Sequence, residues 1–182
     1  MKYLRLFENF EGYDPYELMV IPPNKKAEMI LWEIRKDEPN LNLVHDLITL
    51  GANVDWQNED DQNRTLLHYA IRYRELEIAR ILIDAGADVN MQDDDRGMAP
   101  LHWAASDGLE EFAQMLIGAG ADVNMQDKIG QTSLHWAAEF TDVEFVRMLV
   151  EAGARKDIRN IYDQTPYDLA RNWQMEELLA IE

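Results

Sequence analysis

Apolar positions in this chain come in pairs of short runs, and a turn separates the two runs of each pair. In residues 94–127 the runs lie on either side of Asp107-Gly108, a combination typical of turns. Apolar residues three and four positions apart lie on one face of a helix, so each run predicts a short amphipathic helix. The positions are Leu101, Ala104 and Ala105 in the first run, and Phe112, Met115, Leu116 and Ala119 in the second.

The pair of runs recurs with a period near 33 residues. A Gly-Ala step follows the second run at intervals of 35, 34 and 33 residues, at Gly51, Gly86, Gly120 and Gly153. A histidine lies near the start of three first runs at intervals of 34 and 33 residues, at His68, His102 and His135. A period of this length predicts stacked helix pairs, each too small to fold alone.

We expect an N-terminal extension at residues 1–24 and a repeat domain at residues 25–182. The extension either packs over the first repeat as a cap or docks a partner, and capping is favoured. It carries the aromatic residues Phe7, Phe10, Tyr13 and Tyr16. The pattern fades in the first and last repeats, where a terminal unit must turn one face to water. The expected repeats are approximately residues 25–60, 61–93, 94–127, 128–160 and 161–182.

These repeats resemble ankyrin repeats. The hallmark Thr-Pro-Leu-His-x-Ala is matched with one substitution each by Thr65–Ala70, Ala99–Ala104 and Thr132–Ala137, and Gly-Ala-Asp-Val-Asn is complete at Gly86–Asn90 and Gly120–Asn124. The resemblance covers roughly residues 25–182. It implies an all-α solenoid of stacked helix–turn–helix pairs with projecting β-turn fingers. About three full repeats would lie between degenerate capping repeats at the two ends.

Two of the turns between helices lack the glycine that the middle repeat has at Gly108. Arg74 and Thr141 stand in its place. We expect both to adopt a left-handed backbone conformation, at some cost because each carries a Cβ.

Composition excludes several classes of function. There is no cysteine, which excludes disulfides, a thiolate nucleophile and a cysteine metal site. The net charge of −18 repels phosphate backbones, so we expect no direct binding to nucleic acid. No apolar stretch approaches the length of a membrane span, so we expect no membrane association. A cytoplasmic protein is expected.

The sequence offers no constellation for catalysis, so we expect no enzyme activity, no cofactor and no metal. Histidines in neighbouring stacked repeats would lie about 10 Å apart, which is too far for one metal ion. The resemblance implies instead that each histidine bridges its own turn by hydrogen bonds to the backbone and the threonine hydroxyl. Ser106 and Ser133 are the only serines, and neither lies in a nucleophile elbow.

The resemblance places a protein-binding surface on the fingers and on the exposed side of each first helix, at positions that vary while the framework repeats. Apolar residues among these positions predict an exposed ladder with charged neighbours, the composition of an interaction hot spot. The alternative is a set of scattered exposed hydrophobic residues, which is common. The ladder residues are Tyr73, Met98, Ile129, Phe140 and Trp173. The predicted partner-binding residues are Arg64, Arg72, Tyr73, Arg96, Met98, Asp107, Ile129, Gln131, Glu139, Phe140, Tyr162 and Trp173. A second aromatic series, Tyr69, Trp103 and Trp136, is expected to pack between repeats.

We therefore expect a protein–protein interaction module that presents a rigid concave surface to a basic or amphipathic protein partner. A monomer is expected, with a homodimer through residues 1–24 as an alternative. Two other functions stay open: an acidic inhibitor or immunity-type subunit of another enzyme, and a self-associating structural protein. The acidity also fits a role in solubility alone.

The resemblance also gives Asn90 and Asn124 the context in which a cellular dioxygenase hydroxylates ankyrin asparagines. Hydroxylation of either residue is a hypothesis that mass spectrometry of the natively expressed protein tests.

Overall fold

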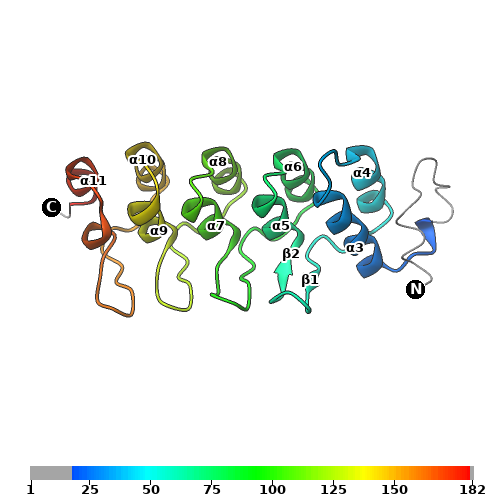
Figure 1. The fold of residues 1–182 in the computed structure, drawn as a ribbon, viewed down its shortest axis with the longest axis horizontal. Coiled ribbons are helices and arrows are strands. Elements are labelled where there is room, and N and C mark those ends of the chain that lie inside the picture. Colours follow the sequence, from blue (N-terminus) through cyan, green and yellow to red (C-terminus); the bar gives the residue numbers. More distant parts are fainter. Residues whose placement is uncertain (1–17, 181–182) are drawn as a thin grey trace.

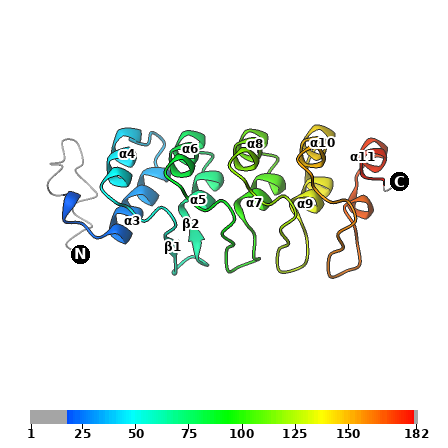
Figure 2. The same cartoon turned by 180° about the vertical axis from the view of Figure 1, so that it is seen from behind.

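The computed structural model describes residues 18–180 as a row of helix pairs stacked side by side (Figure 1). Each pair has an inner helix, a tight turn and an outer helix, and loops project from one side of the row, as the view from behind also shows (Figure 2). The inner helices are α3 (Pro23–Ile34), α5 (Leu66–Arg72), α7 (Pro100–Ser106), α9 (Ser133–Phe140) and the 3-10 helix η1 (Tyr167–Leu169). The outer helices are α4 (Leu41–Thr49), α6 (Leu76–Asp84), α8 (Glu110–Gly118), α10 (Val143–Glu151) and α11 (Trp173–Leu179). The predicted all-α solenoid, with a degenerate last repeat, is confirmed.

The loops between successive pairs, which we call fingers, are joined to one another through their main chains. The first finger contains an antiparallel hairpin of β1 (Gln57–Asn58) and β2 (Arg64–Thr65). Single main-chain N–H to carbonyl bonds link each finger to the next, from Asp94 to Gln62 at 2.7 Å, Lys128 to Arg96 at 2.8 Å and Ile161 to Ile129 at 3.0 Å. The fingers therefore form one continuous row whose positions are set by the stacking of the repeats.

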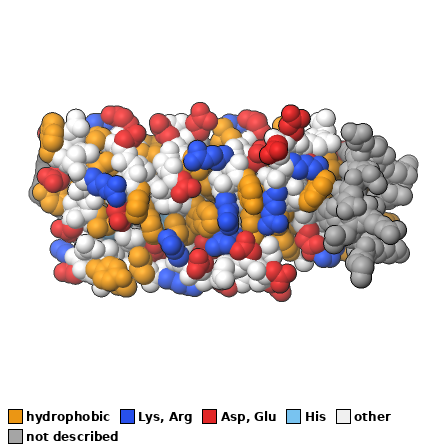
Figure 3. Space-filling model, in the orientation of Figure 1, with side chains coloured by type: hydrophobic (Ala, Val, Ile, Leu, Met, Phe, Trp, Pro, Cys, Tyr) orange, Lys and Arg blue, Asp and Glu red, His pale blue; other side chains and the backbone are white. Residues whose placement is uncertain are grey.

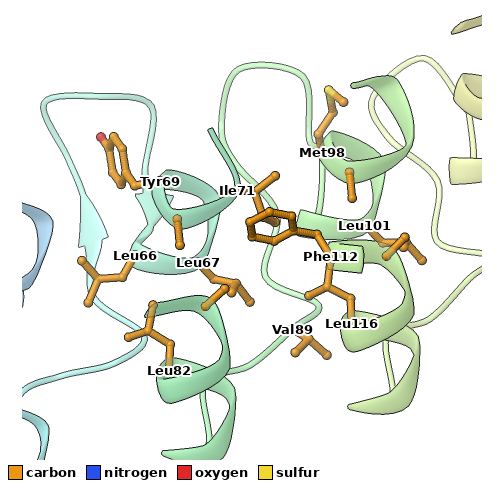
Figure 4. Packing of buried hydrophobic residues seen from close by; sticks show 14 of the residues in the cluster. Leu66, Leu67, Tyr69, Ile71, Leu82, Val89, Met98, Leu101, Phe112 and Leu116 are labelled. Carbon is orange, nitrogen blue, oxygen red and sulfur yellow. The ribbon is translucent and has the colours of Figure 1, made fainter. Parts of the chain in front are cut away.

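The core is a single apolar cluster that runs through the stack between the inner and outer helices (Figure 4). Leu67 and Leu82 from one repeat and Leu101 and Leu116 from the next are all at most 1% exposed. Each repeat thus covers apolar side chains of its neighbour, which is why no repeat is expected to be stable alone.

The outer helices end as the Gly-Ala steps predict. Gly86 follows α6 with φ of 89°, and Gly120 follows α8 with φ of 90°. The N–H of Gly86 donates to the carbonyl of Ile83 at 2.9 Å, and that of Ala87 donates to Leu82 at 3.0 Å. This pattern satisfies carbonyls that the helix end would otherwise leave unpaired.

The two turns that lack glycine differ from each other. Arg74 has φ of 62°, so the left-handed conformation predicted there is confirmed. The same prediction for Thr141 is wrong, because its φ of −116° and ψ of −164° are those of extended backbone. The hydroxyl of Thr141 donates to the carbonyl of Ala137 at 2.8 Å, and Asp142 accepts the Phe145 N–H at 3.0 Å as the N-cap of α10. This turn therefore needs no glycine, because the chain is extended at Thr141 and Asp142 caps the start of α10.

The N-terminal end of the stack is closed by the last residues of the predicted extension. Leu18 and Ile21 are 1% and 6% exposed and belong to the core cluster. Leu18 and Ile21 thus pack on the first repeat. The capping role of the whole extension stays a prediction, because residues 1–17 lie outside the described part of the chain.

The first repeat also contains a buried carboxylate. Glu33 is 0% exposed and accepts hydrogen bonds from the Lys36 ammonium at 2.6 Å and the Asn40 N–H at 2.8 Å. These bonds tie the end of α3 to the start of α4. Within residues 18–180, no helix combines the length and the apolar character that crossing a membrane would require.

Candidate protein-binding surface

The three repeated histidines hold the repeats together. The His68 Nδ1 accepts the Thr65 N–H at 3.2 Å, so Nε2 carries the proton and donates to the Met98 carbonyl at 3.0 Å. His102 and His135 make the same two kinds of bond, with Nε2 donating to the carbonyls of Met125 and Gln164 at 2.9 Å and 3.1 Å. The expected structural role is confirmed. His68 and His135 also bond the next repeat, which the sequence did not predict, whereas Met125 lies in the same repeat as His102.

Burial sets the charge of these rings. Desolvation lowers the pKa of His68 from 6.5 to about 4, although the hydrogen bond to the Met98 carbonyl opposes it. Desolvation also lowers the pKa values of His102 and His135. The rings are therefore neutral at physiological pH. Among the described residues, no group of three or more His, Asp or Glu side chains is arranged to hold a metal ion.

The aromatic residues that follow the histidines anchor the fingers. The Trp103 Nε1 donates to Asp93 at 2.9 Å, and the Trp136 Nε1 donates to Asp127 at 3.0 Å. The other carboxylate oxygen of Asp93 accepts the N–H of Arg96 at 3.0 Å, inside the finger. These bonds join each finger to its helix, which the sequence analysis did not predict. The packing between repeats that it did predict is seen at Trp103, whose ring lies edge-on to that of His68 with the ring centres 5.7 Å apart.

Most of the predicted partner-binding residues reach the surface. The exposed ones are Arg72, Tyr73, Arg96, Asp107, Phe140, Tyr162 and Trp173, and the partly exposed ones are Arg64, Ile129 and Glu139. Tyr73, Asp107 and Phe140 lie at or beside the ends of α5, α7 and α9. They occupy equivalent repeat positions, each five residues after a repeated histidine. We call the exposed C-terminal ends of all the inner helices, from α3 to η1, together with the fingers, the inner face.

Two predicted residues are buried, so the expectation that they are exposed is wrong. Met98 is 5% exposed because it lies where the finger returns to α7, and its carbonyl accepts the bond from His68. Gln131 is 6% exposed, and its main chain closes its finger through bonds of 2.9 Å and 2.8 Å to Asp127. Neither side chain is available to a partner in this conformation.

Trp173 is exposed, but not at the end of an inner helix as predicted. It is the first residue of α11 and lines a cleft of about 550 Å³ with Val143 and Lys156, between α10 and α11. The inner helix of the last repeat is shortened to η1, so the chain enters its outer helix earlier than in the other repeats. Trp173 therefore belongs to the outer layer, and the predicted apolar ladder is reduced to Tyr73, Phe140 and the partly exposed Ile129.

Each junction between repeats carries an arginine next to an aromatic ring of the adjacent repeat. The distances from guanidinium carbon to ring centre are 5.3 Å for Arg35 and Tyr69, 5.3 Å for Arg64 and Trp103, 5.9 Å for Arg96 and Trp136, and 5.4 Å for Arg171 and Phe140. Sequence reasoning selected Arg64 and Arg96 but missed Arg35 and Arg171, which lie outside the finger positions. In Figure 3, basic side chains alternate with hydrophobic ones in a band across the middle of the molecule.

A groove opens at the junction of the second and third repeats. It has a volume of about 340 Å³, and its walls include Arg64, Arg72, Arg96 and Trp103. Arg64 is held by Asp61 and by Asp95, the latter at 3.4 Å. Its Nε is buried without a hydrogen-bond partner among the described residues. The groove therefore combines an aromatic surface with cationic donors.

A comparison with known protein families assigns the repeat pattern. The family model described as "Ankyrin repeats (3 copies)" matches residues 31–127 and again residues 102–179. Together these matches cover most of the chain.

Curated relatives share a shorter segment. The human and mouse proteins described as "Neurogenic locus notch homolog protein 2" are each 39% identical over 57 residues, which is 31% of this chain and 2% of their own length. The chain thus spans a very small part of these relatives. The stack of helix pairs, the repeated histidines that bond their own turns and the family match all agree. The chain belongs to the ankyrin-repeat family.

Proposed function

We propose that this chain is a protein-binding module, and that its inner face binds a polypeptide partner as a preformed, rigid and concave surface. Ankyrin repeats are general protein–protein interaction modules, which supports this class of function. The observation that carries the proposal for this chain is the placement of Tyr73 and Phe140. These rings are 41% and 47% exposed at equivalent positions two repeats apart.

Preorganisation supports the same proposal. The fingers are joined by main-chain bonds, and Asp93 and Asp127 fix the finger turns by accepting hydrogen bonds from the indoles of Trp103 and Trp136. A surface whose backbone is already ordered loses little conformational entropy on binding. Exposed aromatic residues with neighbouring arginines have the composition of binding hot spots.

Of the two expected partner types, the amphipathic one is the better supported. The basic partner was expected from the net charge of the whole chain, −18, but the inner face carries arginines at each junction. We propose that residues 25–182 act as one module, that the module is cytoplasmic, and that it has no catalytic role.

The experiment is affinity capture from the native host with three full-length proteins: the wild type, the Tyr73→Ala/Phe140→Ala double variant and a Trp173→Ala control. Both changes of the double variant remove exposed rings, so circular dichroism should show an intact fold. Two lost hot-spot side chains should weaken binding by about tenfold or more. The control removes a 68% exposed ring from the outer layer and should retain the partner. Equal capture by the wild type and the double variant would contradict the proposal.

The net charge also supports a second candidate, an acidic inhibitor or immunity-type subunit of another enzyme. The two candidates differ in their response to salt. Binding by charge mimicry should weaken steeply as ionic strength rises, whereas binding through apolar rings should change little. Titrations of the captured partner at increasing salt concentration therefore separate them.

A further inference from the structure

Among the described residues, three of the four arginines at the repeat junctions lack the carboxylate partners that several arginines elsewhere have. On the outer side and in the later loops, Arg80, Arg147 and Arg155 form ion pairs with acidic neighbours at 3.9 Å, 3.4 Å and 2.8 Å. Within residues 18–180, Arg35, Arg96 and Arg171 form no ion pair, although acidic residues outnumber basic ones by 35 to 17 in the sequence. The charges of these three arginines are open to a ligand.

Their geometry suits carboxylates. A guanidinium group that stacks on an aromatic ring keeps its N–H groups at the edge, where they can donate to a carboxylate in a bidentate manner. The pairs of Arg35 with Tyr69, of Arg96 with Trp136 and of Arg171 with Phe140 join different repeats. They mark successive junctions along the row, together with the pair formed by Arg64.

The acidic residues in the groove are already engaged. Asp93 is 3% exposed and accepts bonds from the Trp103 indole and from finger N–H groups. Asp95 lies 3.4 Å from Arg64, and Asp107 accepts the Ser106 hydroxyl at 3.1 Å. They therefore leave Arg96 without a carboxylate partner. Their negative charge and that of the whole chain also disfavour the binding of a long polyanion such as nucleic acid.

The spacing of the junctions defines the ligand further. Stacked helices lie about 10 Å apart, and an extended polyproline-type chain rises about 3.1 Å per residue with three residues per turn. An extended segment would thus present a side chain to successive junctions at every third residue. The ligand that fits is an extended segment with acidic side chains at this interval.

The chain itself contains such a segment. Residues 7–17 read Phe-Glu-Asn-Phe-Glu-Gly-Tyr-Asp-Pro-Tyr-Glu, with an acidic residue at every third position. The acidic positions are Glu8, Glu11, Asp14 and Glu17, and each follows an aromatic residue. Gly12 and Pro15 are residues of low helix propensity, which suits binding in an extended form. Four acidic residues at this interval match the spacing of the four junctions with arginine–ring pairs. Three of these junctions offer an arginine without an ion pair to residues 18–180, and at the remaining one Arg64 is already paired with Asp61 and Asp95.

We infer that the inner face binds residues 7–17 of a second copy of this chain, with their carboxylates on the junction arginines. This inference rests on the proposed function, because it names an occupant for the same surface. A second copy is chosen because the described chain begins beyond α3, on the side away from α5 (Figure 1). A segment folding back in its own chain would first have to pass α3, leaving fewer residues for the junctions. Reciprocal exchange between two copies closes a dimer.

The first measurement is molar mass by light scattering over a range of concentrations. The wild type should rise from the monomer mass of 21.2 kDa towards twice that value as its concentration increases. A full-length tail variant, Glu8→Lys/Glu11→Lys/Asp14→Lys/Glu17→Lys, should remain a monomer. An inner variant, Arg35→Gln/Arg96→Gln/Arg171→Gln, should also remain a monomer. The matched outer variant, Arg80→Gln/Arg147→Gln/Arg155→Gln, makes the same change in charge and should dimerise like the wild type.

The second measurement is fluorescence polarisation with a labelled synthetic peptide of residues 6–17. The tail variant serves as receiver, because its own segment no longer competes. Adding the inner substitutions to it should raise the Kd at least about tenfold, as expected for the loss of three exposed ion pairs, and adding the outer substitutions should change it less than about twofold. A peptide with lysine at the four acidic positions should not bind.

Each other result overturns the inference. Failure of the peptide to bind, or equal binding by the inner and outer variants, removes the proposed contacts. Dimers that persist in the inner variant place the interface elsewhere. The wild type could also stay monomeric and fail to bind the peptide, while the tail variant binds it. In that case the inner face is occupied by residues 7–17 of the same chain and not of a second copy. In all these cases loss of the captured partner in Tyr73→Ala/Phe140→Ala would still support the proposed function.

Discussion

Lowering the pH should unfold the stack through its buried histidines. The perturbation is a change from pH 7.5 to pH 5. His68 has a pKa of about 4 in the folded chain because it is buried, against 6.5 for an exposed ring. Between these two values the unfolded chain binds more protons than the folded chain, so stability is present above pH 6.5 and is lost as the pH falls towards 4.

The magnitude follows from the two pKa values. The difference corresponds to a maximum of about 3 kcal/mol, of which about 2 kcal/mol is already lost at pH 5. His102 and His135 act in the same direction, since burial lowers both pKa values. Carboxylates have ordinary pKa values near 4, so the range from pH 6.5 to pH 5 reports mainly on the histidines.

Urea unfolding followed by circular dichroism measures this effect at a series of pH values. The free energy of unfolding of the wild type should fall by at least about 2 kcal/mol between pH 7.5 and pH 5. His68→Gln should be less stable at pH 7.5 but should show a pH dependence smaller by about that amount. Leu82→Ala is the control, because it removes a fully buried side chain that does not titrate and should lower stability equally at each pH. A flat wild-type profile, or an unchanged profile in His68→Gln, would refute the reasoning.

Two further predictions concern stability. Glu33→Gln should lower the free energy of unfolding by about 1–3 kcal/mol in the same urea assay, because the buried carboxylate of Glu33 accepts hydrogen bonds from Lys36 and Asn40. Unchanged stability would contradict this prediction and would show that a neutral amide supports the end of α3 equally well. Arg74→Gly should raise the melting temperature, because Arg74 has φ of 62° and glycine removes the steric cost of its Cβ. Thr141→Gly should lower the melting temperature, because Thr141 is extended and its hydroxyl donates to the carbonyl of Ala137. Equal shifts in the two glycine variants would argue against this difference between the turns.

The stack was predictable because its main signals are local. The apolar spacing around Leu101 and Leu116, the glycine at Gly120 and the Thr-x-x-His turn at His135 act within single repeats. Each such signal specifies a helix, its end or its start through residues a few positions apart. The repetition of the signals then requires stacking, since no single pair buries its apolar face.

Exposure and position were predicted less well, because they depend on neighbouring repeats. Met98 and Gln131 occupy finger positions, but the return of the finger to the next helix buries both. Trp173 was assigned by its offset in the repeat, and the shortening of the last inner helix to η1 moved it to the outer layer. The position of a residue within its repeat predicts where it lies in that repeat. It does not predict whether the neighbouring repeat buries the side chain.

The sequence by itself determined the class of fold, the order of the helix pairs and the structural role of the repeated histidines in their turns. Only the tertiary structure decided that His68 bonds the next repeat and that Arg35 and Arg171 stack on rings of adjacent repeats. The physical reason is distance along the chain. Helices and turns form from contacts between residues a few positions apart, whereas these contacts join residues about 30 positions apart that meet only when the repeats stack.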